Sequence, residues 1–392
     1  LLSSATNYFM YNYGVYIDAT MIRNTFETNQ REALDLLTFK LFVWITITGI
    51  IPAIILIFTK IKYKKFLSEL KLRLIFSGIG ILIILIFTGI SFKEYAAFGR
   101  NNRDVRKLIN TINYNYATIR YFRLQYLAHR KFIILDKNPQ IIPYDDKSRT
   151  LLVLVIGETA RAKNFSLNNY DRETNPLLKK EDIVNFKNVS SCGTATAISV
   201  PCIFSNMNRE EFDVVDAKYI ENLLDIVKSA GYDVIWLDND DGCKGVCNRV
   251  YTEEMVKINN KKYCDGEYCM DDVLLDGLDD RIKNIKKDTL LVIHTMGSHG
   301  PTYYKRYPES FKKFTPSCDT AELQNCEKQQ IVNAYDNTIL YTDYILSSII
   351  KSLKKFPELE SSMLYVSDHG ESLGENNIYL HSMPYKIAPE EQ

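Results

Sequence analysis

The chain has 392 residues, a length that suggests two or three domains. Its 48 basic and 48 acidic residues cancel to a formal net charge of zero, so the overall charge gives no indication of nucleic-acid binding. We therefore expect no nucleic-acid partner. The indications of function come instead from how apolar, cysteine and histidine residues are distributed along the chain.

The first part of the chain alternates between a polar segment and two long apolar runs. Residues 1–35 are aromatic but too polar to span a membrane, and we expect them to lie at its outer, periplasmic interface. The runs 36–59 and 74–92 carry one charge, Lys40, between them. Each is about long enough to cross a ~30 Å hydrocarbon core as a helix. A pair of buried core helices is the alternative, but a charge-free run as long as the second is hard to place in water.

The segment that joins the two apolar runs, 60–73, is rich in lysine and arginine and has a single acidic residue, Glu69. Short basic loops stay on the cytoplasmic side of a membrane. We therefore predict that 36–92 forms two transmembrane helices joined by a cytoplasmic loop, and that everything after residue 93 lies across the membrane.

Residues 93–149 are rich in Tyr, Asn and Arg and have aromatic and basic residues at helical spacing. This pattern suits interfacial helices that lie along lipid headgroups, although a solvated linker helix is an alternative. Pro139 and Pro143 mark the entry to a soluble domain, which we expect to occupy 150–392.

In 150–392, apolar strand-like runs alternate with helical stretches, which indicates an α/β fold with a mostly parallel sheet and helices on both faces. The predicted strands are 151–156, 184–190, 233–237, 289–294 and 362–367. The predicted helices are about 197–206, 217–230, 271–286 and 328–355.

All eight cysteines lie in this part of the chain and fall into four close pairs: Cys192/Cys202, Cys243/Cys247, Cys264/Cys269 and Cys318/Cys326. Disulfides persist outside the cytosol, where the predicted topology places them, so we expect four local bridges. The alternative is a structural zinc site made by the two middle pairs.

Two of the predicted strands end in residues that bind metals. Glu158 follows LLVLVIG, and the run MLYVSDHGES supplies Asp368 and His369 from one turn. Zinc accepts such mixed oxygen and nitrogen ligands readily. The alternatives are a helix N-cap for Glu158 and a capping Asp beside a surface His for the other pair.

The segment GTATAIS offers Thr194 and Thr196 as nucleophiles. A threonine hydroxyl is a poor nucleophile unless a metal or a base activates it. If Thr196 begins a helix, the amides and dipole at its N-terminus would favour an incoming phosphate. An ordinary threonine cap is the alternative.

Four of the chain's five histidines lie in the motifs of this domain. His294 and His299 belong to LLVIHTMGSHGP, and His381 follows His369 in YLHSMP. Histidines beside a zinc can bind a second metal, protonate a leaving group or hydrogen-bond a phosphate. The alternative, a purely structural role for all of them, is disfavoured by their number.

Taken together, these motifs resemble the phosphoethanolamine transferase family, which includes lipid A (lipopolysaccharide) modifying enzymes and the mobile colistin- and polymyxin-resistance enzymes of the alkaline phosphatase and sulfatase superfamily. The membrane part is similar to the family in NYFMYNYGVYIDATMIRN and in its two spans. The matching stretches of the soluble part, which cover most of 150–389, are GETARAKNFSLNNYDRETNP, SSCGTATAISVPCIFS, DNDDGCKGVCNR, HTMGSHGPTYYKRYP and SDHGESLGENNIYLHSMPYKIAP.

The resemblance implies an alkaline-phosphatase-like fold with at least one zinc ion, and it assigns roles residue by residue. The residues implied for the zinc site are Glu158, Thr196, Asp368 and His369, with Thr196 as the acceptor of the transferred group. Those implied for a second zinc or for the substrate phosphate are His299 and His381, and His294 lies beside them. Those implied for headgroup binding are Glu211 and Lys244. The four cysteine pairs match family disulfides.

The resemblance also implies a function. Phosphoethanolamine would pass from phosphatidylethanolamine to Thr196 and then to lipid A or a related envelope glycan, while diacylglycerol leaves after protonation by His294, His299 or His381. The protein would be a multi-pass, monomeric enzyme of the bacterial inner membrane whose catalytic domain faces the periplasm.

Two departures from the family pattern stand out. Asp240 and Asp241 replace less acidic residues near Lys244, which puts the acceptor preference in doubt. The family pattern also has transmembrane spans before the position of residue 1 and a sheet strand after that of Gln392, and this sequence has no counterpart of either. We therefore expect a fragment that lacks both ends. The functional alternatives are a phosphatase- or sulfatase-like hydrolase, a glycerophosphate transferase and a membrane-tethered binding module.

Overall fold

The computed structural model describes residues 1–27, 30–60, 62–63, 65–101, 103–126, 130–142 and 149–391. The end of the predicted linker, including Pro143, lies outside the described residues. A five-stranded parallel sheet forms the centre of the second half of the chain, in the order β3-β2-β4-β1-β5. Its strands are β1 (Arg149–Gly157), β2 (Asp233–Asp238), β3 (Tyr251–Glu254), β4 (Thr289–His294) and β5 (Leu359–Ser367). The predicted α/β fold is therefore confirmed.

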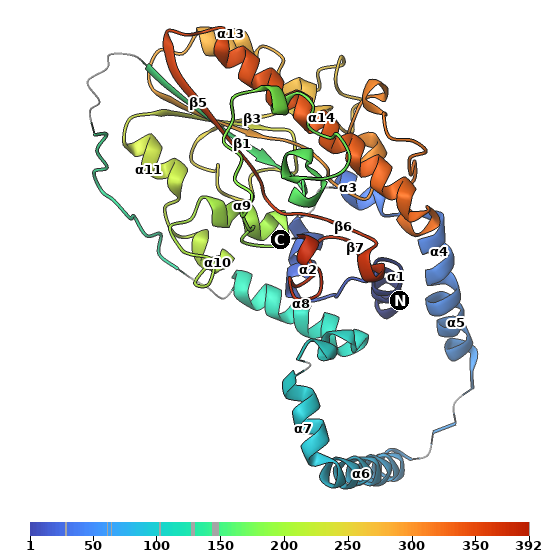
Figure 1. Cartoon of the computed structure of the whole chain (residues 1–392). Helices are drawn as coiled ribbons and strands as arrows, with labels where there is room; N and C mark the ends of the chain where they lie inside the picture. Colours follow the sequence, from blue (N-terminus) through green and yellow to red (C-terminus); the bar gives the residue numbers. More distant parts are fainter. Residues whose placement is uncertain are drawn as a thin grey trace.

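Helices cover both faces of this sheet, which explains why its inner strands are nearly continuously apolar. On one face, α13 (Leu278–Lys283) and the long α14 (Lys328–Lys354) pack on the core. On the other, α9 (Thr196–Ile203) and α11 (Leu223–Ser229) pack around the fully buried Trp236. Figure 1 shows α14 and α11 on opposite sides of the strands.

Most predicted elements of this domain are present, with two exceptions among the strands. The strand predicted at 184–190 is wrong, because Val184, Phe186 and Val189 lie in an irregular segment and are 58–80% exposed. Conversely, the sequence analysis missed β3, since its residues YTEE are polar and form a short edge strand.

The predicted helices are also shorter than expected at two places. The helix predicted at 217–230 is divided into α10 (Val214–Ala217) and α11, and that at 271–286 into a 3-10 turn (Asp271–Leu274) and α13. Near the C-terminus, β6 (Ser372–Leu373) and β7 (Tyr379–Leu380) form a small antiparallel pair.

The described part of residues 1–126 is helical. Its helices are α1 (Leu2–Tyr13), α2 (Ala19–Glu27), α3 (Gln30–Asp35), α4 (Phe39–Ile45), α5 (Ile51–Phe58), α6 (Phe66–Ile90), α7 (Phe92–Asn101) and α8 (Asn110–Tyr126), with a π-helical segment (Thr46–Ile50) between α4 and α5. Two stretches, Phe39–Phe58 and Phe66–Ile90, are long and apolar enough to cross a membrane. Since α6 begins at Phe66, part of the predicted loop 60–73 is helical.

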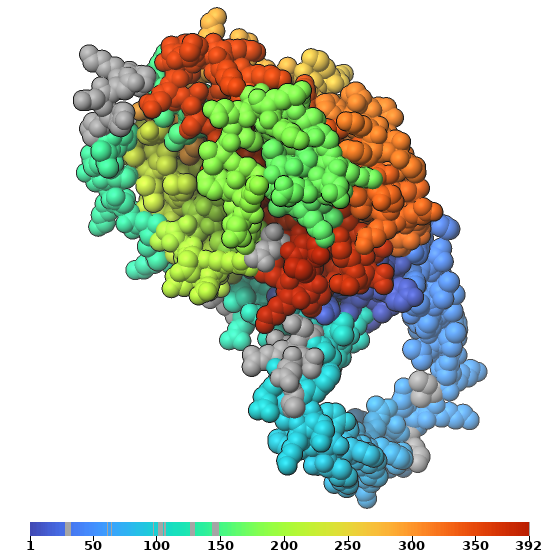
Figure 2. All heavy atoms as spheres, in the orientation of Figure 1, coloured from blue at the N-terminus to red at the C-terminus, as the bar shows by residue number. Residues whose placement is uncertain are grey.

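The apolar side chains of α6 are exposed, and none of its described residues is buried. Figures 1 and 2 show α6 and α7 projecting away from the rest of the molecule. Large exposed apolar surfaces of this kind mark sites of membrane or protein contact. The transmembrane assignment therefore fits the structure, while the predicted orientation stays a prediction.

The N-terminal segment (residues 1–35) packs against the C-terminal end of the sheet domain. Tyr8, Tyr13 and Ile17 share a buried cluster with Ile378 and Met383. Figure 1 shows α1 and α2 beside β6 and β7, which are more than three hundred residues later in the chain. This contact between distant segments was not predicted from the sequence.

Asp343 of α14 provides a prediction about stability. Its two carboxylate oxygens accept hydrogen bonds from the backbone N–H groups of Leu177 and Leu178 at 2.8 and 2.9 Å, and burial raises its pKa to about 6. The unfolded chain holds this proton less tightly, with a pKa of about 3.9. The contribution of Asp343 to stability is therefore full below about pH 4 and is lost as the pH rises through 6.

We expect the thermal unfolding midpoint of Asp343→Asn to fall less between pH 4 and 6 than that of the unchanged chain, because the amide does not titrate. Circular dichroism in detergent at several pH values would measure this difference. Parallel pH profiles for the two proteins would contradict the prediction.

Candidate active site

The polar residues that follow the strands gather at one edge of the sheet. The register pairs Gly157 of β1 with Ser367 of β5, and Ile156 of β1 with His294 of β4. The residues after these strands therefore emerge side by side at the carboxyl ends of the strands. This is the edge at which open α/β sheets bind their ligands.

Glu158, Asp368 and His369 form a buried group at this edge, with ligand atoms within 4.8 Å of one another. Their residues are 0–2% exposed. Thr196 begins α9, and its Oγ1 donates a hydrogen bond to Glu158 Oε2 at 3.1 Å and lies 3.4 Å from His369 Nε2. The structure thus brings together the four residues that the sequence analysis placed in one site.

Backbone contacts hold this group in place. Asp368 Oδ1 accepts hydrogen bonds from the N–H groups of Thr159 and His369 at 3.1 and 2.7 Å. Gly297 has a φ of +51°, and a Cβ there would lie 2.7 Å from the Glu158 carbonyl oxygen. A glycine at this position therefore allows the loop after β4 to pack directly on Glu158.

The group fits a divalent metal ion. Among the described residues, Asp368 Oδ2 is buried without a hydrogen-bond partner. Burial lowers the pKa of His369, and its Nδ1 lies 2.8 Å from the Gly370 carbonyl oxygen, so Nδ1 carries the proton and Nε2 offers a lone pair. Two carboxylates, a neutral imidazole and a hydroxyl are a ligand set that zinc accepts.

A second group lies beside the first and consists of His369, Glu371 and His381. The His381 ring centroid is 4.6 Å from that of His369 and 5.9 Å from that of His299. Burial alone would lower the pKa of His381, but Glu371, 3.0 Å from its Nδ1, raises it to about 9. Glu371 was missed from the sequence, although it stands in the same SDHGES turn as Asp368.

His294 has different surroundings. Its Nδ1 is 3.2 Å from Asp238 and its Nε2 is 3.6 Å from Asp240, while Asp240 also forms a metal-compatible group with Glu158 and His294. Burial alone would lower the pKa of His294, but Asp238 and Asp240 raise it to about 9. His294 is not among the residues that line the pocket, although its Nε2 lies 3.6 Å from the lining residue Asp240.

A pocket of about 350 Å³ opens above Thr196. Its wall includes Lys244, whose Nζ donates hydrogen bonds to the backbone oxygen and the carboxylate of Asp241 at 2.8 and 3.0 Å. The other lining residues are Asn24, Glu27, Ala197, Asp240, Asp241, His299 and His381. Asn24 and Glu27 come from α2, so the N-terminal segment supplies part of the wall, which the sequence analysis did not anticipate.

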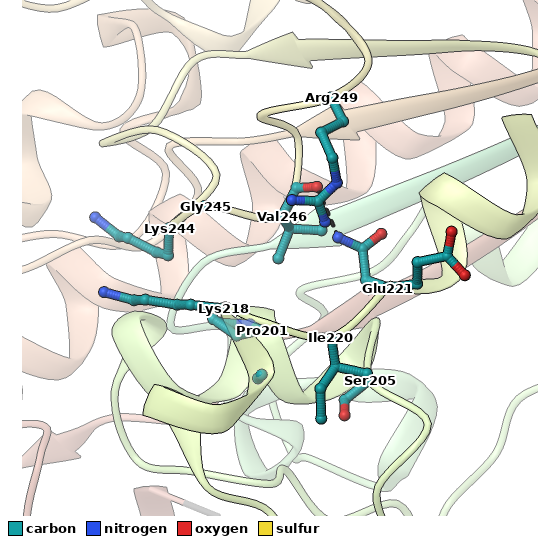
Figure 3. Close-up of a pocket in the computed structure, with 11 residues that line it drawn as sticks. Pro201, Ser205, Lys218, Ile220, Glu221, Lys244, Gly245, Val246 and Arg249 are labelled. Carbon is teal, nitrogen blue, oxygen red and sulfur yellow. Dashed lines mark hydrogen bonds between the residues drawn. The ribbon is translucent and has the colours of Figure 1, made fainter. Parts of the chain in front are cut away.

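The two residues predicted for headgroup binding differ in their positions. Lys244 lines the pocket, whereas Glu211 is exposed, is not among the lining residues and accepts a hydrogen bond from Asn208. Lys244 also lines an adjoining groove of about 360 Å³. Figure 3 shows that Lys218 and Lys244 point in the same direction there, away from Arg249 and Glu221.

Four disulfides frame this region, and they are the four predicted pairs: Cys192–Cys202, Cys243–Cys247, Cys264–Cys269 and Cys318–Cys326. The alternative of a cysteine zinc site is therefore wrong. The first bridge encloses Thr196 and the second encloses Lys244, so each restricts the loop that carries a pocket residue.

Comparisons with known proteins agree along the whole chain. The sulfatase family model matches residues 150–392, and the model of phosphoethanolamine transferase EptA/EptB matches residues 1–126. Phosphoethanolamine transferase EptA from Escherichia coli is 43% identical over 100% of this chain and 72% of its own length. Phosphatidylethanolamine transferase Mcr-1, also from Escherichia coli, is 39% identical over 100% of this chain and 75% of its own.

A solved structure is similar over the full length as well. The integral membrane protein lipooligosaccharide phosphoethanolamine transferase A (EptA) from Neisseria meningitidis superposes with a TM-score of 0.95. It is 41% identical, and the match covers 100% of this chain and 74% of that protein. The likeness therefore includes both the helical first half and the sheet domain.

Proposed function

The chain belongs to the phosphoethanolamine transferases of the sulfatase superfamily, and from this we propose that it transfers phosphoethanolamine from phosphatidylethanolamine to lipid A or a related envelope glycan. The observation that carries the proposal is the position of Thr196. Its hydroxyl lies at the N-terminus of α9, within hydrogen-bond distance of Glu158, and Thr196 lines a pocket together with Lys244, His299 and His381.

In the first half-reaction, the Thr196 hydroxyl attacks the phosphorus of the lipid donor. Glu158 Oε2 accepts the hydrogen bond of that hydroxyl and is therefore placed to receive its proton. A zinc ion bound by Glu158, Asp368 and His369 would favour the ionised hydroxyl and offset charge on the phosphoryl oxygens. The N–H groups of the first turn of α9 add partial positive charge at the same place.

The bond between phosphorus and the diacylglycerol oxygen then breaks, and that oxygen needs a proton. We assign this proton to His381, because it lines the pocket and its Nδ1 pairs with Glu371, which leaves Nε2 for the substrate. His299 lines the same pocket and would contact the phosphate. Thr196 now carries phosphoethanolamine as a phosphate diester.

In the second half-reaction, a phosphate or hydroxyl oxygen of the acceptor attacks the same phosphorus, and a proton on that oxygen passes to His381. The Thr196 oxygen leaves and takes back the proton that Glu158 received. Two transfers at one threonine imply ping-pong kinetics. The second group of metal-compatible residues consists of His369, Glu371 and His381. If this group bound a second zinc ion, His381 would be a metal ligand instead of a proton donor.

The membrane location of the proposed substrates agrees with the two apolar helices, Phe39–Phe58 and Phe66–Ile90. We propose that these helices anchor the chain in a bacterial inner membrane, that the sheet domain faces the periplasm and that the enzyme acts as a monomer. An anchored site meets a lipid donor within the membrane plane, which reduces the entropy cost of the encounter.

The test is to incubate the purified full chain in detergent with phosphatidylethanolamine and lipid A and to follow both lipids by mass spectrometry. We expect lipid A to gain phosphoethanolamine while an equal amount of diacylglycerol forms. Phosphatidylglycerol in place of the donor is the control. Diacylglycerol formed together with free phosphoethanolamine and unmodified lipid A would identify a hydrolase and contradict the proposal.

A further inference from the structure

Asp35, the last residue of α3, reaches from the N-terminal segment into the sheet domain. Its Oδ1 accepts a hydrogen bond from Lys305 Nζ at 2.9 Å. Its Oδ2 accepts hydrogen bonds from Tyr268 Oη at 2.8 Å and from Thr302 Oγ1 at 3.1 Å. The Asp35 side chain is 11% exposed, so these contacts are largely shielded from water.

Arg306 completes this contact and connects it with the pocket. Its side chain is 1% exposed, its guanidinium lies 4.3 Å from the Tyr268 ring centroid, and its Nη2 is 3.8 Å from Asp35 Oδ2. Its Nε donates a hydrogen bond to the backbone oxygen of His299 at 2.9 Å. Among the described residues, both Nη atoms lack a hydrogen-bond partner, so Asp35 supplies the charge that compensates this buried cation.

The charge of Asp35 is itself stabilised by these contacts. Burial alone would raise the pKa of Asp35, but the hydrogen bonds from Lys305 and Tyr268 hold it below its usual value. The contact is therefore an ion pair between two parts of the chain that the family models match separately.

The two segments that Asp35 and Arg306 connect each supply residues that line the pocket. The N-terminal segment supplies Asn24 and Glu27 from α2, and the loop that Arg306 holds supplies His299. We propose that Asp35 is a positioning residue, which fastens the N-terminal segment to loop 299–306 through Arg306 and so holds the two walls around Thr196. The proposal rests on the transfer function proposed above.

The test compares Asp35→Asn, Arg306→Gln and the double variant in the whole 392-residue chain, purified in detergent. Asp35→Asn keeps the shape of the side chain but leaves Arg306 without its counter-charge. We expect its kcat/KM for transfer to fall by about tenfold or more, since small displacements of pocket groups are costly. The double variant should be no worse than Arg306→Gln alone, because both changes break one connection.

Asp319→Asn is the matched control, because Asp319 forms an ion pair with Lys312 at the same 2.9 Å but lies outside the pocket. It should transfer at the unchanged rate. All transfer rates are measured at a temperature well below each variant's thermal unfolding midpoint. A loss of stability alone then does not change these rates. Wild-type transfer by Asp35→Asn under these conditions, or additive losses in the double variant, would overturn the proposal.

A second measurement does not depend on transfer. Trypsin cleaves after arginine, and Arg306 is 3% exposed in the intact chain. We expect cleavage after Arg306 to be at least several-fold faster in Asp35→Asn than in the unchanged chain and in Asp319→Asn. If Asp35→Asn is cleaved no faster than the unchanged chain, the proposed connection is wrong. If Asp35→Asn is cleaved faster but the unchanged chain transfers no phosphoethanolamine, only the proposed function is wrong.

Discussion

Thr196→Ala is expected to lower the rate of phosphoethanolamine transfer by at least about 1,000-fold, because it removes the atom to which the transferred group becomes attached. Among the described residues, the hydrogen-bond partners of the Thr196 hydroxyl are Glu158 and His369. Mass spectrometry of the intact chain after incubation with donor alone should show added phosphoethanolamine in the unchanged protein and none in the variant.

Thr194→Ala is the matched control for this experiment, since Thr194 stands two residues earlier in the same GTATAIS segment. Its backbone oxygen accepts a hydrogen bond from Ser382, and the substitution leaves that bond intact. The control should transfer nearly normally. Transfer by Thr196→Ala within tenfold of the unchanged rate would contradict the proposed nucleophile.

The second large effect is expected from Asp368→Asn, which should lower zinc binding and transfer by at least about 100-fold. The change keeps an oxygen to accept the hydrogen bonds from Thr159 and His369. It places an NH₂ group where Oδ2 has no hydrogen-bond partner among the described residues. An NH₂ group carries no charge and offers no lone pair for a metal. Elemental analysis of the purified protein would measure bound zinc independently of activity.

Asp343→Asn is the control for this second prediction, because Asp343 is another buried carboxylate but belongs to none of the metal-compatible groups found among the described residues. Its zinc content should equal that of the unchanged chain. Equal zinc contents in Asp368→Asn and in the unchanged chain would show that Asp368 is not a ligand. Dialysis against a chelator should reproduce the loss of transfer, and added zinc should restore it.

The sequence predicted that Glu158, Thr196, Asp368 and His369 share one site, and they lie together in the structure because the signals for their positions are local. Glu158 and Asp368 each follow a buried apolar strand, and parallel strands deliver the residues after them to one edge of the sheet. The sequence signal for Thr196 as a nucleophile was weaker on its own, since a threonine at the start of a helix is common. Its importance depended on the other motifs in the same chain.

The rest of the pocket could not be predicted in this way, because it depends on contacts between distant segments. Asn24 and Glu27 reach the pocket from α2, and no periodicity or spacing links them to Thr196. The strand predicted at 184–190 fails for the opposite reason. Its apolar residues satisfy a local pattern, but among the described residues no strand pairs with them, and Val184, Phe186 and Val189 remain exposed.

The origin of the pocket wall in α2 has a consequence for inhibitor discovery. The sulfatase match begins at residue 150, so hydrolases that share this scaffold have no counterpart of α2 in the matched region. In a screen against residues 150–392 alone, the pocket would lack the wall that α2 supplies. Such a screen would favour compounds whose contacts are common to the superfamily. A compound that also touches Asn24 or Glu27 would make contacts that residues 150–392 alone do not offer, and only the longer chain would reveal them.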